Sequence, residues 1–189
     1  MMPESWTFQR PWEDFFTVVQ WDQRGAGKTF SAAHRVPDPS MTVGELQSDA
    51  EQLIGWLRQR YGKKKIYLVG FSFGSILGLR IASQHPDWLY AYIGVGQVVN
   101  GHRNEVVGYQ ETLARAQAMH DEAAIKGLKS IAPYPNATGL TPLQKIVVER
   151  HWDVALGGML YGRTQDDSPS IWALSPAYSA YDVQSAELG

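Results

Sequence analysis

Hydrophobic positions in the first half of the chain form short continuous runs, separated by stretches with helical spacing. Residues 15–21, 66–71 and 91–95 are rich in β-branched and aromatic side chains, and a glycine-containing turn lies at or just after the end of each. These runs are therefore predicted to be strands. Between the first two, apolar side chains recur at helical spacing from residue 46 to residue 57, which predicts a helix. Apolar strands separated by helices favour parallel pairing with both sheet faces covered.

Local signals indicate where these helices begin and end. Thr42 followed by Glu45 fits the Thr-x-x-Glu capping box, and Gly62 stops the same helix. A second helix is predicted to begin near Ser75, directly after the second strand. It ends at residues 84–86, where a proline stands.

The second half of the chain has a different pattern, with no further strand predicted from residue 100 onward. A proline-rich breaker at residues 132–136 interrupts a series of helical segments. The segments predicted to be helical are 109–120, 122–130, 141–157 and a short aromatic one within 170–181. A helical stretch directly after a βαβαβ run is typical of a lid inserted into an α/β core. The expected division is a partial core over residues 1–96 and an incomplete helical lid over residues 97–189.

Composition narrows the class of protein. The chain is 44% hydrophobic and 19% charged, which is typical of a globular domain, and its net charge of −2 gives no reason to expect nucleic acid or an anionic membrane as a partner. The lack of cysteine excludes disulfides, thiolate catalysis and cysteine metal sites. It fits a reducing compartment, so a cytoplasmic location is expected. Neither a signal peptide nor an apolar stretch of membrane-spanning length is recognised.

The strongest chemical signal is Gly-x-Ser-x-Gly at residues 70–74, where a predicted strand runs into a predicted helix. This is the pattern of a nucleophile elbow, with Ser72 as nucleophile and the backbone N–H of Phe73 as oxyanion donor. A side chain at Gly70 or Gly74 is expected to collide with the neighbouring strand or helix. The alternative is that the two glycines merely shape an ordinary βα turn.

Two sequence blocks resemble the proline iminopeptidase-like α/β-hydrolases. Residues 22–29 resemble the family's Asp-Gln-Arg-Gly-x-Gly-x-Ser/Thr loop, and residues 69–75 resemble its elbow. The resemblance covers about residues 5–96, and beyond that it is architectural only. It implies an α/β-hydrolase fold, with a mostly parallel sheet flanked by helices and an inserted helical lid. It also implies that Ser72 forms an acyl-enzyme with a small amide or ester or a short peptide, with no metal or organic cofactor.

Within this resemblance the substrate stays open. A proline iminopeptidase-like aminopeptidase is the first expectation. A carboxylesterase or amidase of the same fold, and a non-catalytic binding protein that uses the pocket without the serine, are the alternatives.

The sequence departs from the family pattern in two places. No His-Gly-Gly-Pro-type oxyanion loop precedes residue 22, and no acid and histidine follow the lid in the order expected for a triad. These parts are expected to lie outside this chain. The sheet is then expected to lack the strand between residues 15–21 and 66–71. The segment alone is predicted to be inactive, because it lacks the triad histidine and the second oxyanion donor. Its folded form is expected to close the gap, to borrow a strand from another copy in a homo-oligomer, or to belong to a longer protein.

Other residues are assigned weaker roles. Asp22 and Arg24 are expected to brace the loop beside the active site through charge-assisted hydrogen bonds. Lid carboxylates could receive a substrate's α-amino group, although solvated helix glutamates are the commoner case; these are Glu105, Glu111 and Glu149. Lid aromatics could line an acyl or prolyl site or simply pack the lid; these are Tyr109, Tyr134, Trp152, Tyr161 and Trp172.

Residues 25–29 also resemble the end of a phosphate-binding loop. The full Gly-x-x-x-x-Gly-Lys-Thr pattern requires glycine where Asp22 stands, and a carboxylate there would face the phosphates. A nucleotide-binding protein is therefore kept only as a remote alternative.

Overall fold

A computed structural model describes residues 9–39, 41–136, 140–159, 161–165, 175–176 and 178–183. The chain divides into two compact units. The core unit comprises Met1–Gln97 and Ser168–Gly189, and the helical unit comprises Val98–Asp167. A domain boundary after residue 96 stays a prediction.

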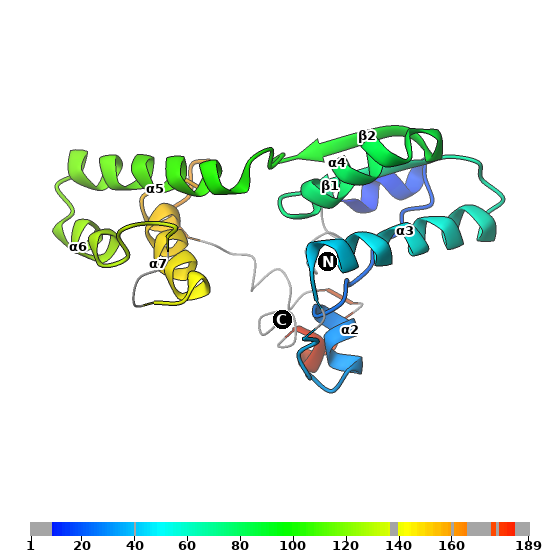
Figure 1. The fold of residues 1–189 in the computed structure, drawn as a ribbon, viewed down its shortest axis with the longest axis horizontal. Helices are drawn as coiled ribbons and strands as arrows, with labels where there is room; N and C mark the ends of the chain where they lie inside the picture. The colour runs from blue at the N-terminus through cyan, green and yellow to red at the C-terminus, as the bar shows by residue number, and fades with distance from the viewer. Residues whose placement is uncertain are drawn as a thin grey trace. The chain divides into compact units, whose positions relative to one another are not determined.

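The core unit contains a parallel two-stranded sheet and its helices (Figure 1). Its elements, in chain order, are η1 (Arg10–Asp14), α2 (Gly27–Ala32), α3 (Val43–Arg60), β1 (Ile66–Phe71), α4 (Gly74–Gln84), η2 (Pro86–Trp88) and β2 (Leu89–Val95). The predicted helix between residues 42 and 61 is confirmed, with the Thr42 side chain accepting a hydrogen bond from the N–H of Glu45. The two later strands are also confirmed.

One face of the sheet is covered by α4, and α3 packs against α4 in turn (Figure 1). β1 and β2 pair in parallel, with Val69 opposite Ile93 and Phe71 opposite Val95. The Tyr92 ring lies so close to Gly78 of α4 that a Cβ there would stand 2.5 Å from the ring. Helix and sheet therefore pack closely at Gly78, in the first half of α4.

The other face of the sheet is exposed within the described part of the chain, contrary to the expectation that both faces are covered. Its apolar side chains retain 37% to 62% of their accessible surface. They are Tyr67, Val69 and Phe71 of β1 and Ile93 and Val95 of β2. Parallel sheets normally bury both faces, so the described core is partial.

The predicted strand at residues 15–21 is wrong. The structure has a turn followed by irregular backbone there, and among the described residues no neighbouring strand offers it hydrogen bonds. Its aromatic character is used differently: the Phe16 ring contacts Tyr67 edge-on, with ring centroids 5.6 Å apart. A β-prone segment without a partner cannot form a ladder, whatever its composition.

The helical unit contains α5 (Gly101–Ala118), α6 (Glu122–Ser130) and α7 (Pro142–Ala155) (Figure 1). The absence of strands from residue 100 onward is confirmed for the described residues. All three helices were expected, but α5 begins earlier than predicted, because the Asn100 side chain caps it by accepting from the N–H of Arg103. Their small apolar core is formed by Ala116, Ala124, Leu128 and Leu156. The predicted helix within 170–181 lies largely outside the described residues.

Candidate active site

Ser72 occupies a sharp turn between β1 and α4. Its φ angle is +50°, in the left-handed region that non-glycine residues rarely adopt, and its side chain is exposed. The N–H of Ser72 donates to the carbonyl of Val95 over 2.9 Å, which ties the turn to the end of β2. Backbone strain held in place by neighbouring structure is characteristic of functional turns.

The two flanking glycines differ. A Cβ at Gly70 would lie 2.7 Å from the carbonyl oxygen of Gly74 and 2.9 Å from Cα of Ser75. The expected collision is therefore confirmed for Gly70. It is wrong for Gly74, where a Cβ would meet no described atom within 4 Å. Only Gly70 is required by the contact between strand and helix.

The N–H of Phe73 stands at the start of α4, where Phe73 is the N-cap residue. Among the described residues no acceptor is bonded to this N–H, whereas two donors further along are used: the N–H of Ser75 donates to the carbonyl of Ser72, and the N–H of Ile76 donates to the carbonyl of Phe73. A helix start leaves N–H groups available and carries partial positive charge. The geometry is therefore suited to receive an oxyanion beside Ser72.

A polar cluster not predicted from sequence lies beneath this turn. The Ser75 hydroxyl, fully buried, donates to the carbonyl of Ser72 over 2.5 Å. The carbonyl of Ser75 in turn accepts from Gln97 Nε2 at 3.2 Å, and the Tyr92 hydroxyl lies 3.0 Å from it. The sequence signal for this cluster is the pair Gly78 and Gly94, whose missing side chains leave room for it.

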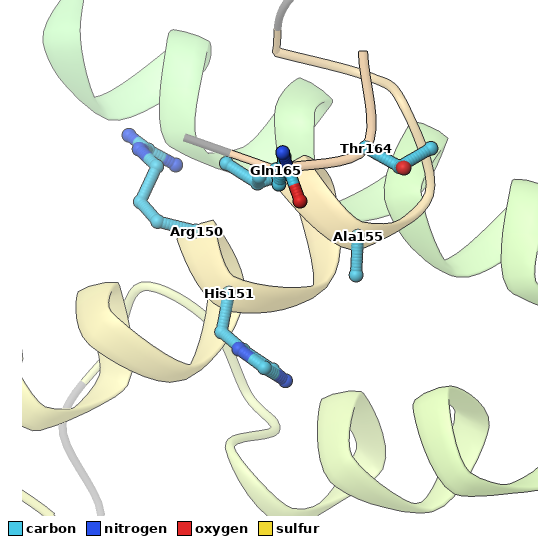
Figure 2. Close-up of a pocket in the computed structure, with 6 residues that line it drawn as sticks. Arg150, His151, Ala155, Thr164 and Gln165 are labelled. Atoms are coloured by element: carbon cyan, nitrogen blue, oxygen red, sulfur yellow. The ribbon is translucent and has the colours of Figure 1, made fainter. Parts of the chain in front are cut away.

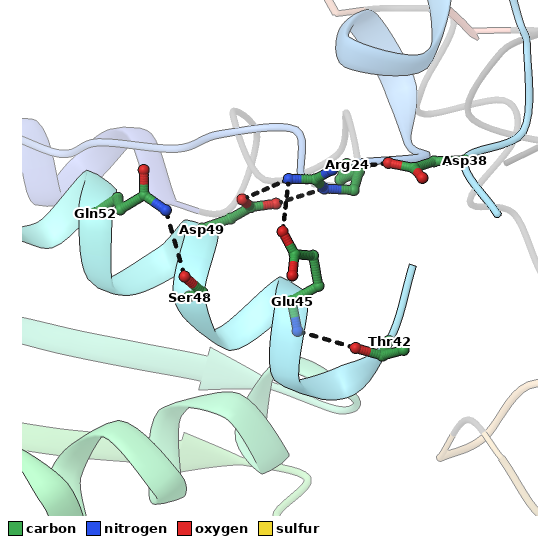
Figure 3. Close-up of polar contacts among 7 residues, drawn as sticks. All are labelled: Arg24, Asp38, Thr42, Glu45, Ser48, Asp49 and Gln52. Carbon is green, nitrogen blue, oxygen red and sulfur yellow. Dashed lines mark hydrogen bonds and ion pairs between the residues drawn. The ribbon is translucent and has the colours of Figure 1, made fainter. Parts of the chain in front are cut away.

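Arg24 is held by acidic side chains from two directions (Figure 3). It makes two bonds of 2.8 Å to Asp49, one of 2.7 Å to Asp38, and a longer contact of 3.4 Å to Glu45. The hydrogen bond from Arg24 holds the pKa of the Asp49 carboxyl below its usual range. The charge-assisted bonds expected of Arg24 are present and fasten its loop to α3, while a role beside the active site stays a prediction.

Asp22 folds back onto the start of α2. Its carboxylate accepts from the N–H of Lys28 at 2.8 Å, and its carbonyl accepts from the Thr29 hydroxyl at 2.6 Å. The Tyr178 hydroxyl also hydrogen-bonds this carboxylate. The place that a phosphate would take in a Gly-Lys-Thr loop is thus filled by a side chain of the loop itself, which argues against nucleotide binding here.

None of the five histidines makes a hydrogen bond to Ser72 among the described residues. Within the core unit, His85 stacks on Trp88 with ring centroids 3.7 Å apart and lies 3.6 Å from Glu51. His34 follows α2 with a positive φ. The remaining three belong to the helical unit, namely His102, His120 and His151. The described residues therefore supply Ser72 with no visible base.

Two of the three lid carboxylates named as candidate amine receptors, Glu105 and Glu149, pair with the same arginine. Arg150 pairs with Glu105 at 2.5 Å and with the fully buried Glu149. Burial raises the pKa of Glu149. Burial also acts to raise the pKa of Glu105, but the Tyr134 hydroxyl and the Arg150 charge outweigh it, so that pKa is lowered. Both carboxylates already have a positive partner, and an amine-binding role for them stays a prediction.

Aromatic residues of the helical unit serve its own packing. Tyr109 and Tyr134 stack with ring centroids 5.3 Å apart. Trp152 packs against the apolar core and lies so close to Gly127 that a Cβ there would overlap its Nε1 atom. Tyr161 is fully exposed. These contacts favour the packing interpretation, and Trp172 lies outside the described residues.

A hollow of about 440 Å³ opens beside α7 (Figure 2). Its lining consists of Arg150, His151, Val154, Ala155, Thr164 and Gln165. Arg150 is paired with Glu105 and Glu149, so its positive charge is already neutralised within the protein.

The described residues contain no cluster of three or more His, Cys, Asp or Glu side chains that could hold a metal ion. None of their helices is both long and apolar enough to span a bilayer.

Comparison with known proteins identifies the family. Residues 6–117, more than half of the chain, match the sequence profile of the alpha/beta hydrolase fold. The chain belongs to the α/β-hydrolase fold family, as the elbow and the parallel sheet indicate. Among solved structures, none matches the chain significantly.

Several relatives similar to this chain carry aminopeptidase or esterase names. It is 44% identical over 103 residues to a probable aminopeptidase YbaC of Bacillus subtilis (54% of this chain, 32% of the relative). It is 36% identical over 94 residues to a probable proline iminopeptidase of Streptomyces coelicolor (48% and 27%). It is 36% identical over 62 residues to a putative esterase NocK of Nocardia uniformis (33% and 17%). The matched region spans about a third or less of the length of these relatives.

Proposed function

We propose that this protein is a serine hydrolase in which Ser72 is acylated by a small amide or ester substrate. Ser72 Oγ attacks the carbonyl carbon while a general base takes its proton. The tetrahedral intermediate then collapses as that proton is passed to the leaving amine or alcohol. Water then attacks the acyl-enzyme, releasing the acid and restoring the serine. The N–H of Phe73 stabilises the oxyanion in both steps. The observation that carries the proposal is the strained, exposed Ser72 at the junction of β1 and α4.

The preferred substrate is a peptide or amide with a free N-terminal residue, proline among them. The support is the similarity to relatives named aminopeptidase and proline iminopeptidase. A carboxylesterase is the second candidate, favoured by the relative named as an esterase. A binding protein without catalysis is the third. We also propose a cytoplasmic location, which the lack of cysteine supports.

The test is covalent labelling with a fluorophosphonate probe, followed by hydrolysis assays with proline p-nitroanilide and p-nitrophenyl acetate. We expect the full-length protein to be labelled and its Ser72→Ala variant to be unlabelled. Ser83→Ala, which changes an exposed serine near the end of α4, should retain the label as the matched serine control. Labelling that persists in Ser72→Ala excludes this nucleophile. A labelled protein that cleaves only the ester favours the esterase alternative.

A further inference from the structure

The elbow is tied to β2 at two separate points. The first is the main-chain bond from Ser72 to Val95. The second is formed by two side chains, that of Tyr92 on β2 and that of Gln97 just after β2. Both of these meet the carbonyl of Ser75, in the first turn of α4.

The donors and acceptors in this second tie form an ordered chain. A phenol has a single hydrogen, so Tyr92 cannot donate fully to two acceptors at once. Its shorter contact, 2.6 Å, is to Gln97 Oε1, against 3.0 Å to the Ser75 carbonyl. Gln97 Nε2 donates to that carbonyl at 3.2 Å. Tyr92 therefore orients the amide of Gln97, and Gln97 holds Ser75.

Two glycines make room for this chain of hydrogen bonds. A Cβ at Gly94 would overlap Gln97 Oε1 and stand 3.0 Å from the Tyr92 hydroxyl. At Gly78 a Cβ would meet the Tyr92 ring at 2.5 Å. A larger residue at either position would displace the side chain that it meets. The arrangement is thus built into the backbone on both sides of the sheet–helix contact.

We propose that Tyr92 and Gln97 are positioning residues that hold the first turn of α4 in the geometry needed for reaction at Ser72. The inference rests on the proposed role of Ser72. The tie reaches the site through Ser75, whose hydroxyl holds the Ser72 carbonyl at 2.5 Å. It therefore fixes both the nucleophile's backbone and the N–H of Phe73 that precedes this turn. Small misplacements of such groups cost far more in rate than in binding.

The test compares Tyr92→Phe and Gln97→Met with Tyr90→Phe, which changes an exposed tyrosine on the same strand. Both test variants should lower the rate constant for fluorophosphonate acylation at saturating probe by about three- to tenfold, as expected for loss of one hydrogen bond. The probe concentration for half-maximal rate should stay unchanged. Because Tyr92 acts through Gln97, the double variant should be no slower than Gln97→Met.

Amide hydrogen exchange provides a readout that needs no activity. The hydrogen-bonded amides of Ser75 and Ile76 should exchange faster in Tyr92→Phe and Gln97→Met than in Tyr90→Phe, while those in the middle of α3 should not change. Equal acylation rates, or additive losses in the double variant, would overturn the proposal. If the unmodified full-length protein is not labelled, the proposed function fails. Unchanged exchange at Ser75 and Ile76 would separately refute the positioning role of Tyr92 and Gln97.

Discussion

Replacing Gly70 or Gly74 by alanine adds the same methyl group, but the two substitutions should affect stability differently. Gly70→Ala places a Cβ 2.7 Å from a backbone oxygen, so we expect overpacking to cost about 1–3 kcal/mol in the free energy of unfolding. Gly74→Ala places its Cβ in open space at the first residue of α4. It should be neutral or stabilise by up to about 1 kcal/mol, because alanine favours the helix.

Urea unfolding followed by circular dichroism measures both changes, and each variant serves as control for the other. Equal losses of stability in the two variants would show that the turn is sensitive to any side chain, contrary to the geometry.

Arg150 holds two carboxylates whose pKa values move in opposite directions. The lowered pKa of Glu105 means that its contribution to stability is present above about pH 4.3, its ordinary value, and is lost as pH falls. The raised pKa of Glu149 means that its contribution is present below that pH and is lost as pH rises. Glu105→Gln should therefore be most destabilising near neutral pH. The stability of Glu149→Gln relative to the unmodified protein should improve as pH increases.

A series of urea unfolding curves between pH 3 and pH 8 measures both slopes. Parallel pH dependences for the two variants would contradict the assigned shifts.

At the scale of elements, the loop after residue 21 depends on α3 for its position. Arg24 forms a two-point contact with Asp49, a geometry that lysine cannot reproduce. Arg24→Lys should therefore lower the urea midpoint and speed amide exchange in residues 22–26. Because the pKa of Asp49 is lowered, the difference from the unmodified protein should be present above about pH 4 and fade as pH falls below it. Arg60→Lys, at the end of α3, is the matched control. A difference that grows in acid would contradict the assignment.

Helix starts set by local caps were predicted for α3 and α7 and missed for α5, where Asn100 is the cap. The Thr42 side-chain cap and the capping box at Thr141 place the starts of α3 and α7, because capping depends on residues within one turn. The strand at residues 15–21 failed because a strand needs a neighbour that sequence periodicity does not supply. In the candidate site, the pattern at residues 70–74 predicts Ser72 as the nucleophile, and this role stays a proposal. The supporting Tyr92 lies in the middle of β2 and Gln97 lies just after that strand, and no spacing rule connects them to Ser72.

For the whole molecule, the exposed sheet face should govern behaviour in solution. Exposed apolar faces and open strand edges favour association between chains. We expect the 189-residue chain to self-associate, and Tyr67→Lys or Ile93→Lys to reduce this without loss of helix content. Val107→Lys, on an exposed position of α5, is the control. Sedimentation velocity at several concentrations measures the effect. If the chain is monomeric at all concentrations, the exposed sheet face does not drive association and the prediction is wrong.

In the loop at residues 22–29, the Asp22 carboxylate accepts a main-chain hydrogen bond of the kind that a phosphate oxygen accepts in a phosphate-binding loop. This carboxylate sits where a nucleotide's anionic oxygens would lie, bonded to the N–H of Lys28. A substitution to glycine would complete the letter pattern of a phosphate-binding loop while deleting the group that organises it. The substitution Asp22→Gly would thus improve the match to the phosphate-binding motif and weaken the loop. Genome surveys that compare only the letters of such signatures would then assign a member of the α/β-hydrolase fold family to the nucleotide-binding proteins, although its loop had lost the side chain that orders it.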